Sequence, residues 1–216
     1  MTGVILAGGK SSRMGSNKAL LHVNGERMMD RTVRIYRDIF PEIILVTNEP
    51  LLYLDQDVTI VTDLVRHKGP LMGIYTGLFY ASHDYIFIAA CDMPFMSGDF
   101  IRYMVGCRGD ADIVVPETEG GMEPLHAIYS KRCMGPIRRL LDADRLKVTG
   151  FYKGLRQKII GKDEQGKYDP DGRMFLNLNK PEDLQGTAPL STPRRAIPPG
   201  NCPIFTERSS DDGRES

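Results

Sequence analysis

Short apolar runs alternate with amphipathic stretches along most of this 216-residue chain. The apolar runs are rich in β-branched residues and occupy 2–7, 42–47, 58–62, 85–90, 112–116, 124–129 and 175–179. Runs that are apolar throughout are typical of strands buried on both faces. The pattern therefore predicts an α/β fold, in which a mostly parallel central sheet lies between two helical layers in a Rossmann-like αβα arrangement.

Helical spacing of apolar residues predicts the elements between these strands. The stretch 28–40 carries apolar residues at intervals of four, three and four, which places them on one face of a helix. These residues are Met29, Val33, Tyr36 and Phe40. Three further helices are expected: one that follows a turn at 69–73 and continues to about Ser82, one over 97–105 with Ser97 or Asp99 as its cap, and one over 134–141.

The composition of the chain changes after Leu184. The stretch TAPLSTPRRAIPPGNCPIFTERSSDDGRES is rich in proline, serine and charged residues, which is typical of disordered segments. We therefore expect one folded domain over 1–185 and a disordered tail over 186–216.

Charge and cysteine content exclude several classes of protein. Lys+Arg and Asp+Glu both number 28, so no overall basic field would attract nucleic acid. The four cysteines show no zinc or disulfide spacing, which indicates reduced thiols. Residues 1–20 lack a signal-peptide core, and no apolar run approaches the roughly 20 residues that span a bilayer. We expect a cytoplasmic protein with neither nucleic acid nor a membrane as partner.

A glycine-rich, basic loop, LAGGKSSRMGSNKALL, directly follows the first apolar run. Gly8 and Gly9 allow backbone N–H groups to approach a phosphate, while Arg13 and Lys18 add positive charge. The loop fits neither the P-loop, because its lysine comes three residues after Gly15, nor the dinucleotide fingerprint. It predicts a phosphate cradle of another kind at the carboxyl end of a strand. The alternative is a flexible surface turn with solvated cations.

An acid follows the most apolar strand of the chain. Asp92 comes directly after YIFIAAC, where the strand would end at the ligand-binding edge of the sheet. Mg2+ binds through one or two carboxylates together with substrate phosphates, so Asp92 is a candidate metal ligand beside the cradle. The alternative is a turn or helix-capping acid, which the nearby Pro94 favours.

The first loop closely resembles the signature loop of nucleotidylyltransferases, and its Gly8-Gly9 form is most similar to molybdenum cofactor guanylyltransferases. Later blocks resemble that family in the same order: GPLMG at 69–73, CDMP at 91–94, EPLHAIY at 123–129 and NLNKPEDL at 177–184. The resemblance covers about residues 2–184 and makes 1–185 a nucleotidyltransferase domain. One departure is Asn17, where the family often has an acid before the lysine.

The resemblance implies that the terminal phosphate of molybdopterin attacks the α-phosphorus of GTP, with Mg2+ as cofactor and pyrophosphate as leaving group. Molybdoenzyme maturation proteins are further candidate partners. The implied nucleotide-binding residues are Leu6, Ala7, Gly8, Gly9, Lys18, Asn48, Asp63 and Asp92. The implied catalytic residues are Lys18, Arg13 and Asp92, of which Asp92 is the metal ligand.

Alternatives stay open for the reaction and for the acceptor side. The chain could transfer CMP to the cofactor, activate a sugar 1-phosphate, or bind GTP without catalysis as a cofactor-delivery protein. The P-loop mismatch weakens a GTPase. We expect ETEGGMEPLHAIY to form a loop and strand beside the acceptor, with Met122 and Tyr129 in the core rather than on the pterin. The four histidines form no cluster and are expected to be structural or solvated.

Overall fold

A computed structural model describes residues 1–8, 22–23 and 25–176. Gly9, Arg13, Asn17, Lys18 and the tail 186–216 lie outside the described residues. The helices are α1 (Met28–Arg37), α2 (Gly69–Tyr80), α3 (Gly98–Cys107), α4 (Met134–Asp142) and α5 (Lys162–Gln165), with 3-10 turns η3 (Pro50–Tyr53), η4 (Lys131–Cys133) and η5 (Val148–Phe151). In the described part of the chain, no helix combines the length and apolar character needed to cross a membrane.

The central sheet is mostly parallel, as the sequence predicts. Its strands are β1 (Thr2–Leu6), β4 (Glu42–Val46), β5 (Thr59–Val61), β6 (Tyr85–Ala90), β7 (Ile113–Thr118), β8 (Gly121–Met122), β9 (His126–Ser130) and β10 (Gln157–Ile160). Their order is β10-β7-β9-β6-β1-β4-β5, with β8 paired to β7. Because β9 runs antiparallel to both neighbours, β7 is parallel to β6. A small ribbon of β2 (His22–Val23) and β3 (Glu26–Arg27) stands apart.

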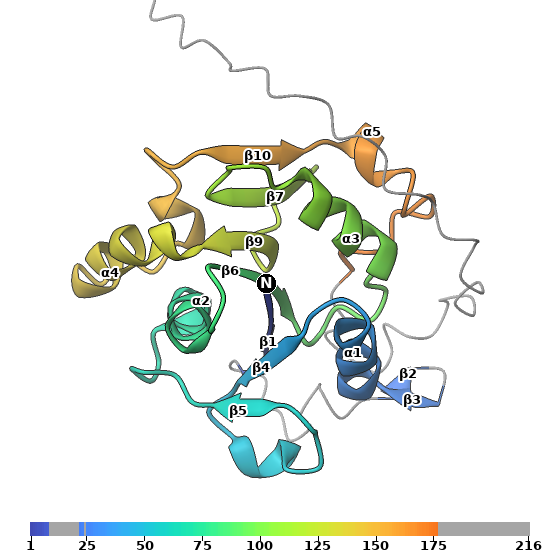
Figure 1. Ribbon diagram of the computed structural model, residues 1–216, viewed down its shortest axis with the longest axis horizontal. Helices are drawn as coiled ribbons and strands as arrows, with labels where there is room; N and C mark the ends of the chain where they lie inside the picture. Colours follow the sequence, from blue (N-terminus) through green and yellow to red (C-terminus); the bar gives the residue numbers. More distant parts are fainter. Residues whose placement is uncertain (9–21, 24, 177–216) are drawn as a thin grey trace, which may run out of the picture.

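Helices cover both faces of this sheet, which gives the three-layer αβα fold (Figure 1). Alternate residues of each strand point to opposite layers. Ile5 packs with α1 and α3, whereas its neighbour Val4 packs with α2 and α4. The predicted apolar face of α1 is confirmed for Met29, Val33 and Tyr36, which are all buried. Phe40 is also buried, but it lies three residues beyond the end of the helix.

Two glycines allow α2 to lie close to β1. A Cβ atom on Gly73 would come within 2.8 Å of the Leu6 side chain, and one on Gly77 within 2.8 Å of Val4. Because real Cβ atoms do not approach other atoms so closely, a larger residue at either position would force the Leu6 or Val4 side chain, or the helix, to shift. The end of β1, where the glycine-rich loop begins, therefore packs closely against α2.

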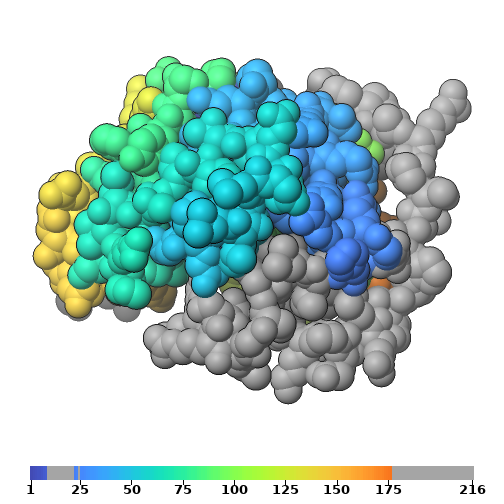
Figure 2. Space-filling model, turned by 90° about the horizontal axis from the view of Figure 1, so that it is seen from below, coloured from blue at the N-terminus to red at the C-terminus, as the bar shows by residue number. Residues whose placement is uncertain are grey.

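The segment that joins β4 to β5 passes beside the first turn of α1. Arg27 forms an ion pair with Asp55, and the side chain of Gln56 donates to Asp30 at 2.9 Å. In Figure 2 the cyan surface of this segment adjoins the blue surface of α1. These contacts hold the edge strand β5 in place, and with it the loop that carries Asp63.

The structure corrects several predicted boundaries. The helix expected over 28–40 ends at Arg37, and the stretch expected as a turn over 69–73 is already part of α2, because Pro70 fits the first turn of a helix. The strand expected over 175–179 is wrong at Phe175 and Leu176, which form a turn and coil, while 177–179 lie outside the described residues. The Asp169 carboxylate accepts the N–H groups of Arg173 and Met174, which bends the chain before Phe175. The cap of α3 is Ser97, whose hydroxyl accepts from the N–H of Phe100.

Candidate active site

The parallel strands bring the described candidate residues to one edge of the sheet. Backbone hydrogen bonds continue the ladders just past the strands: Ala7 N–H donates to Val46 at 2.9 Å, and Cys91 N–H donates to Leu6 at 3.0 Å. The loops after β1, β4 and β6 are thereby tied together. Leu6, Ala7, Gly8, Asn48, Asp63 and Asp92 all lie on these loops or at the strand ends. We call this region the catalytic edge.

Asn48 and Asp63 form a pair on the β4–β5 side of the catalytic edge. The amide nitrogen of Asn48 donates to one carboxylate oxygen of Asp63 at 2.7 Å. The second oxygen of Asp63 and the amide oxygen of Asn48 are buried, and neither accepts a hydrogen bond from the described residues. Buried polar atoms are normally satisfied, so two such acceptors on one hydrogen-bonded pair indicate a site for a ligand with donors.

Burial also affects the protonation of Asp63 in this pair. Loss of solvent raises the pKa of Asp63, and the hydrogen bond from Asn48 opposes that shift. No ion pair to Asp63 occurs among the described residues. A desolvated carboxylate without a cation is costly, which strengthens the case for a donor-rich ligand at this position.

Asp92 lies at the centre of the catalytic edge, two residues after β6, and its side chain is partly exposed. The turn that follows it is anchored, because Arg31 donates from Nε to the Pro94 carbonyl at 2.9 Å. The described residues contain no group of three His, Cys, Asp or Glu side chains around a metal position. A single carboxylate fits Mg2+, which takes its other ligands from phosphates and water.

The cradle itself is described only at its start. Gly8 is exposed, and a Cβ atom placed on it would meet open space, so its backbone is accessible. Gly9, Arg13 and Lys18 lie outside the described residues, and their predicted phosphate contacts stay predictions.

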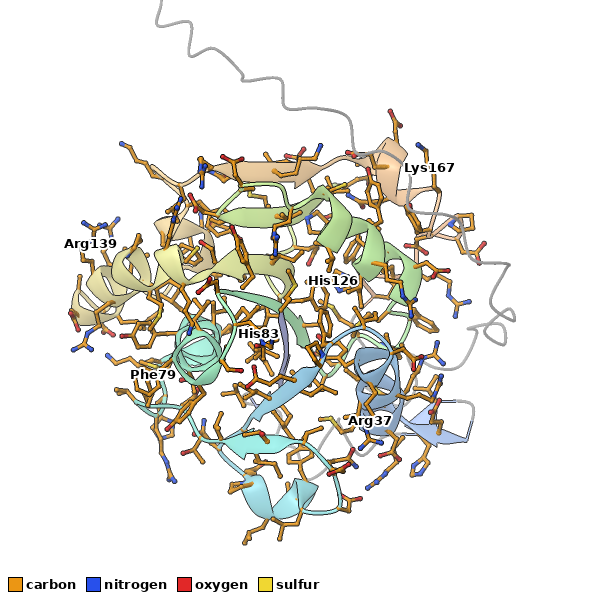
Figure 3. All side chains as sticks on the ribbon, viewed as in Figure 1. Arg37, Phe79, His83, His126, Arg139 and Lys167 are labelled. Atoms are coloured by element: carbon orange, nitrogen blue, oxygen red, sulfur yellow. The ribbon has the colours of Figure 1, made fainter. Side chains whose placement is uncertain are left out.

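The other half of the catalytic edge is built on β7, β8 and β9. His126 begins β9 and is fully buried among Phe87, Phe100 and Phe175, with ring centroids 5.0, 5.9 and 5.4 Å away. Neither ring nitrogen has a hydrogen-bond partner among the described residues. Burial lowers the pKa of His126 to about 3, so the ring is neutral. Figure 3 shows His126 in the interior, consistent with the structural role expected for it.

The expectation that Tyr129 belongs to the core is confirmed. Tyr129 is fully buried, and its hydroxyl donates to the Pro124 carbonyl at 2.8 Å. Met122 is partly buried and packs against the core on the α2 and α4 side. Sequence reasoning did not single out Glu123, a half-buried acid next to Met122. The only feature of the sequence that could have drawn attention to Glu123 is its position before Pro124 in the EPLHAIY block.

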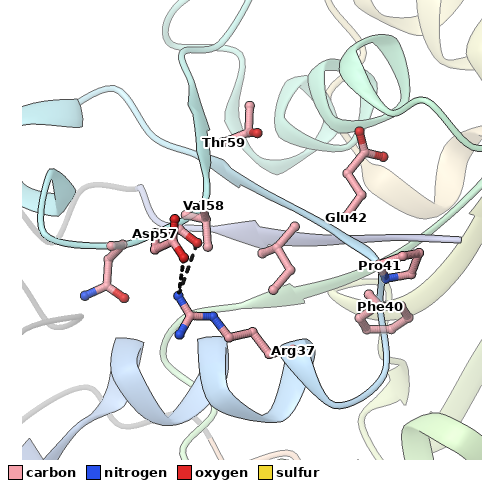
Figure 4. A pocket seen from close by; sticks show the side chains of 9 residues that line it. Arg37, Phe40, Pro41, Glu42, Asp57, Val58 and Thr59 are labelled. Carbon is pink, nitrogen blue, oxygen red and sulfur yellow. Dashed lines mark hydrogen bonds and ion pairs between the residues drawn. The ribbon is translucent and has the colours of Figure 1, made fainter.

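A hollow of about 880 Å³ lies at the opposite edge of the sheet (Figure 4). Glu42 and Thr59, at the amino ends of β4 and β5, help to line it, and Arg37 forms an ion pair there with Asp57 at 3.3 Å. No described candidate residue lines this hollow. Ligands of α/β sheets bind at the carboxyl ends of strands, so we assign no substrate to it.

Comparison with known proteins identifies the family of this chain. The family model of the MobA-like NTP transferase domain matches residues 3–158. The molybdenum cofactor guanylyltransferase of Desulfosudis oleivorans is 41% identical over 187 residues, which cover 86% of this chain and 93% of the relative. That of Syntrophotalea carbinolica is 39% identical over 184 residues, covering 84% and 88%.

Solved structures share the fold. Molybdopterin-guanine dinucleotide biosynthesis protein A of Archaeoglobus fulgidus superposes with a TM-score of 0.73 at 23% identity, covering 86% of this chain and 95% of that one. A Mycobacterium tuberculosis protein in complex with manganese gives 0.54 at 19% identity, covering 74% and 86%. The sequence matches and the arrangement of the catalytic edge place this chain in the MobA-like NTP transferase family, among the molybdenum cofactor guanylyltransferases.

Proposed function

We propose that this protein transfers GMP from GTP to the terminal phosphate of molybdopterin, releasing pyrophosphate and forming the guanine dinucleotide cofactor. The names of the relatives supply the reaction class. The observation that carries the proposal in this chain is the pair of buried oxygens of Asn48 and Asp63 at the catalytic edge, which have no hydrogen-bond partner among the described residues.

Guanine matches these two oxygens in hydrogen-bonding chemistry. Its N1–H and its 2-amino group are neighbouring donors, whereas Asn48 and Asp63 offer two acceptors. Cytosine would present an amino group flanked by a ring acceptor, and that acceptor would face a carboxylate. Leaving a buried group unpaired costs about 1–3 kcal/mol, so the site favours GTP over CTP.

Charge is the main obstacle to the reaction, since two phosphate groups must meet. Unit charges about 4 Å apart repel by about 4 kcal/mol at an effective dielectric near 20. Asp92 would hold Mg2+, which supplies positive charge to the triphosphate when bound. Lys18, Arg13 and the N–H groups around Gly8 and Gly9 would bind the remaining phosphate oxygens.

The chain has little covalent work to do in this reaction. A phosphate oxygen of molybdopterin forms a bond to the α-phosphorus of GTP, and the bond to the β-phosphate oxygen breaks, with its electron pair leaving on pyrophosphate. The attacking oxygen is already ionised, so no general base is needed. The residues bind, orient and neutralise charge, which are the main contributions to such transfers.

The test is incubation of the protein with GTP, Mg2+ and molybdopterin, followed by mass analysis of the product and measurement of pyrophosphate. We expect the guanine dinucleotide, with CTP turned over at least tenfold less efficiently. A cytosine product would reassign the nucleotide. GTP binding without pyrophosphate release, with molybdopterin present, would instead support a non-catalytic delivery protein.

A further inference from the structure

The β7–β8 hairpin carries a second half-buried carboxylate to the catalytic edge. The N–H of Glu123 donates to the Pro116 carbonyl at 2.9 Å, and its carbonyl accepts from His126 N–H at 3.0 Å. Two residues further on, the Leu125 carbonyl accepts from Ala90 N–H at 3.1 Å. Ala90 is the last residue of β6, and Asp92 follows two residues later. These bonds therefore hold the segment that carries Glu123 next to the end of β6.

The carboxylate of Glu123 has unused capacity to accept hydrogen bonds. The hydroxyl of Thr118 donates to one oxygen at 3.3 Å, and the same hydroxyl lies 3.0 Å from the Gly121 carbonyl. No ion pair to Glu123 occurs in the described part of the chain. Burial raises the pKa of Glu123, and the Thr118 hydrogen bond opposes that shift. A desolvated carboxylate with one shared, neutral donor is the chemistry already seen at Asp63.

The two carboxylates lie on opposite flanks of Asp92. Asp63 follows β5, at one end of the strand order, whereas Glu123 follows β8, on the far side of β6. The acceptor of the proposed reaction carries a pterin, whose 2-amino-4-oxo pyrimidine ring presents the same pair of N–H donors as guanine. One carboxylate on each flank offers an acceptor group to each of the two rings that the reaction joins.

We propose that Glu123, held by Thr118, binds the 2-amino and ring N–H edge of the pterin and so determines specificity for the acceptor. This inference rests on the proposed function, because molybdopterin is the acceptor there. Asp63 and Glu123 then form a matched pair, with Asp63 assigned to the base of GTP and Glu123 to the pterin. The backbone bonds to Pro116 and His126 hold Glu123 in position before the ligand arrives.

The test compares wild type with Glu123→Gln, because a carboxamide keeps the shape but places an N–H₂ group against the donors of the pterin. We expect the KM for molybdopterin to rise at least tenfold and the KM for GTP to stay within twofold. Glu123→Asp should recover part of the loss. The matched control is Glu117→Gln, an exposed acid on the same hairpin, which should leave both constants unchanged.

A second readout separates recognition from support of the fold. The probes are 6-hydroxymethylpterin and 6-hydroxymethyllumazine, which has an oxo group in place of the 2-amino group, as inhibitors competing with molybdopterin. Wild type should bind the pterin at least tenfold more tightly than the lumazine, and Glu123→Gln should lose that preference. A preference retained in the variant, or a parallel rise in the KM for GTP, overturns the inference. If wild type makes no dinucleotide, it is the proposed function that fails.

Discussion

The two flanks of the catalytic edge use similar chemistry on different supports. On the β4–β5 flank, Asp63 is paired with an amide, and two buried oxygens remain unpaired. On the β7–β9 flank, Glu123 accepts a hydrogen bond from a hydroxyl, and His126 nearby in the chain is surrounded by aromatic rings. The two proposals assign one nitrogen-rich ring to each flank and the phosphates that join the rings to Asp92 between them.

Removal of the central acid should have the largest effect, because both flanks act on the phosphates that it serves. We expect Asp92→Asn to lower kcat by about 10²–10³-fold, since a neutral amide binds Mg2+ poorly and the repulsion between phosphates returns. Pyrophosphate release measured against Mg2+ concentration checks this, with thermal unfolding as the control for folding. Turnover that keeps its Mg2+ dependence would show that another group holds the metal.

Replacing Asp63 should affect nucleotide binding at the β4–β5 flank and leave acceptor binding unchanged. Hydrogen bonds to charged groups contribute about 1.5–3 kcal/mol, so Asp63→Asn should raise the KM for GTP roughly ten- to hundredfold and leave that for molybdopterin unchanged. Wild type should prefer GTP to ITP, which lacks the 2-amino group, and the variant should lose this preference. Asp57→Asn, an acid that is exposed at the opposite edge, is the matched control. An unaltered GTP-to-ITP ratio would separate Asp63 from the base.

A larger residue at Gly73 should destabilise the packing of α2 against the end of β1. The methyl group of Gly73→Ala would meet the Leu6 side chain at 2.8 Å, so we expect the free energy of unfolding to fall by about 1–3 kcal/mol. Gly135→Ala, in α4, meets nothing within 4 Å and should be neutral or slightly stabilising. Urea unfolding of both variants checks the difference, and equal stability would show that α2 can shift away from β1 at little cost.

The last effect, on the pH dependence of stability rather than on activity, is expected in the core of the β7–β9 flank. The lowered pKa of His126, about 3, means that the folded protein binds fewer protons than the unfolded chain between that pH and about 6.5. Stability should therefore fall as pH drops through this range, by up to about 1.4 kcal/mol per pH unit. His126→Phe should remove that contribution. Urea unfolding of both proteins at several pH values tests this, and identical slopes would contradict it.

The sequence predicts the parts of this molecule that local patterns specify. The apolar runs locate β1, β4 and β6, and the parallel arrangement that they predict brings the residues after them to one edge. Edge strand β10 was missed because QKII is short, half-exposed and interrupted by a lysine. The turn at Phe175 depends on the Asp169 carboxylate, a contact that no periodicity reveals.

The site shows the same division. The family resemblance named Asn48 and Asp63, but only the fold shows that the amide nitrogen of Asn48 lies 2.7 Å from a carboxylate oxygen of Asp63. Only the fold also shows that the other oxygen of each side chain is buried without a hydrogen-bond partner among the described residues. Glu123 escaped notice because nothing in its local sequence distinguishes a half-buried acid from an exposed one. Burial of that kind depends on how the hairpin packs against β7 and β9, which is a property of the tertiary structure.

The most direct test of the account is a crystal structure with Mg2+ and the α,β-methylene analogue of GTP, which cannot release pyrophosphate. We expect the guanine N1–H and 2-amino groups within hydrogen-bond distance of Asp63 and Asn48, and the metal ion on Asp92. A nucleotide bound away from these residues, or a guanine seated on Glu123 instead, would contradict it.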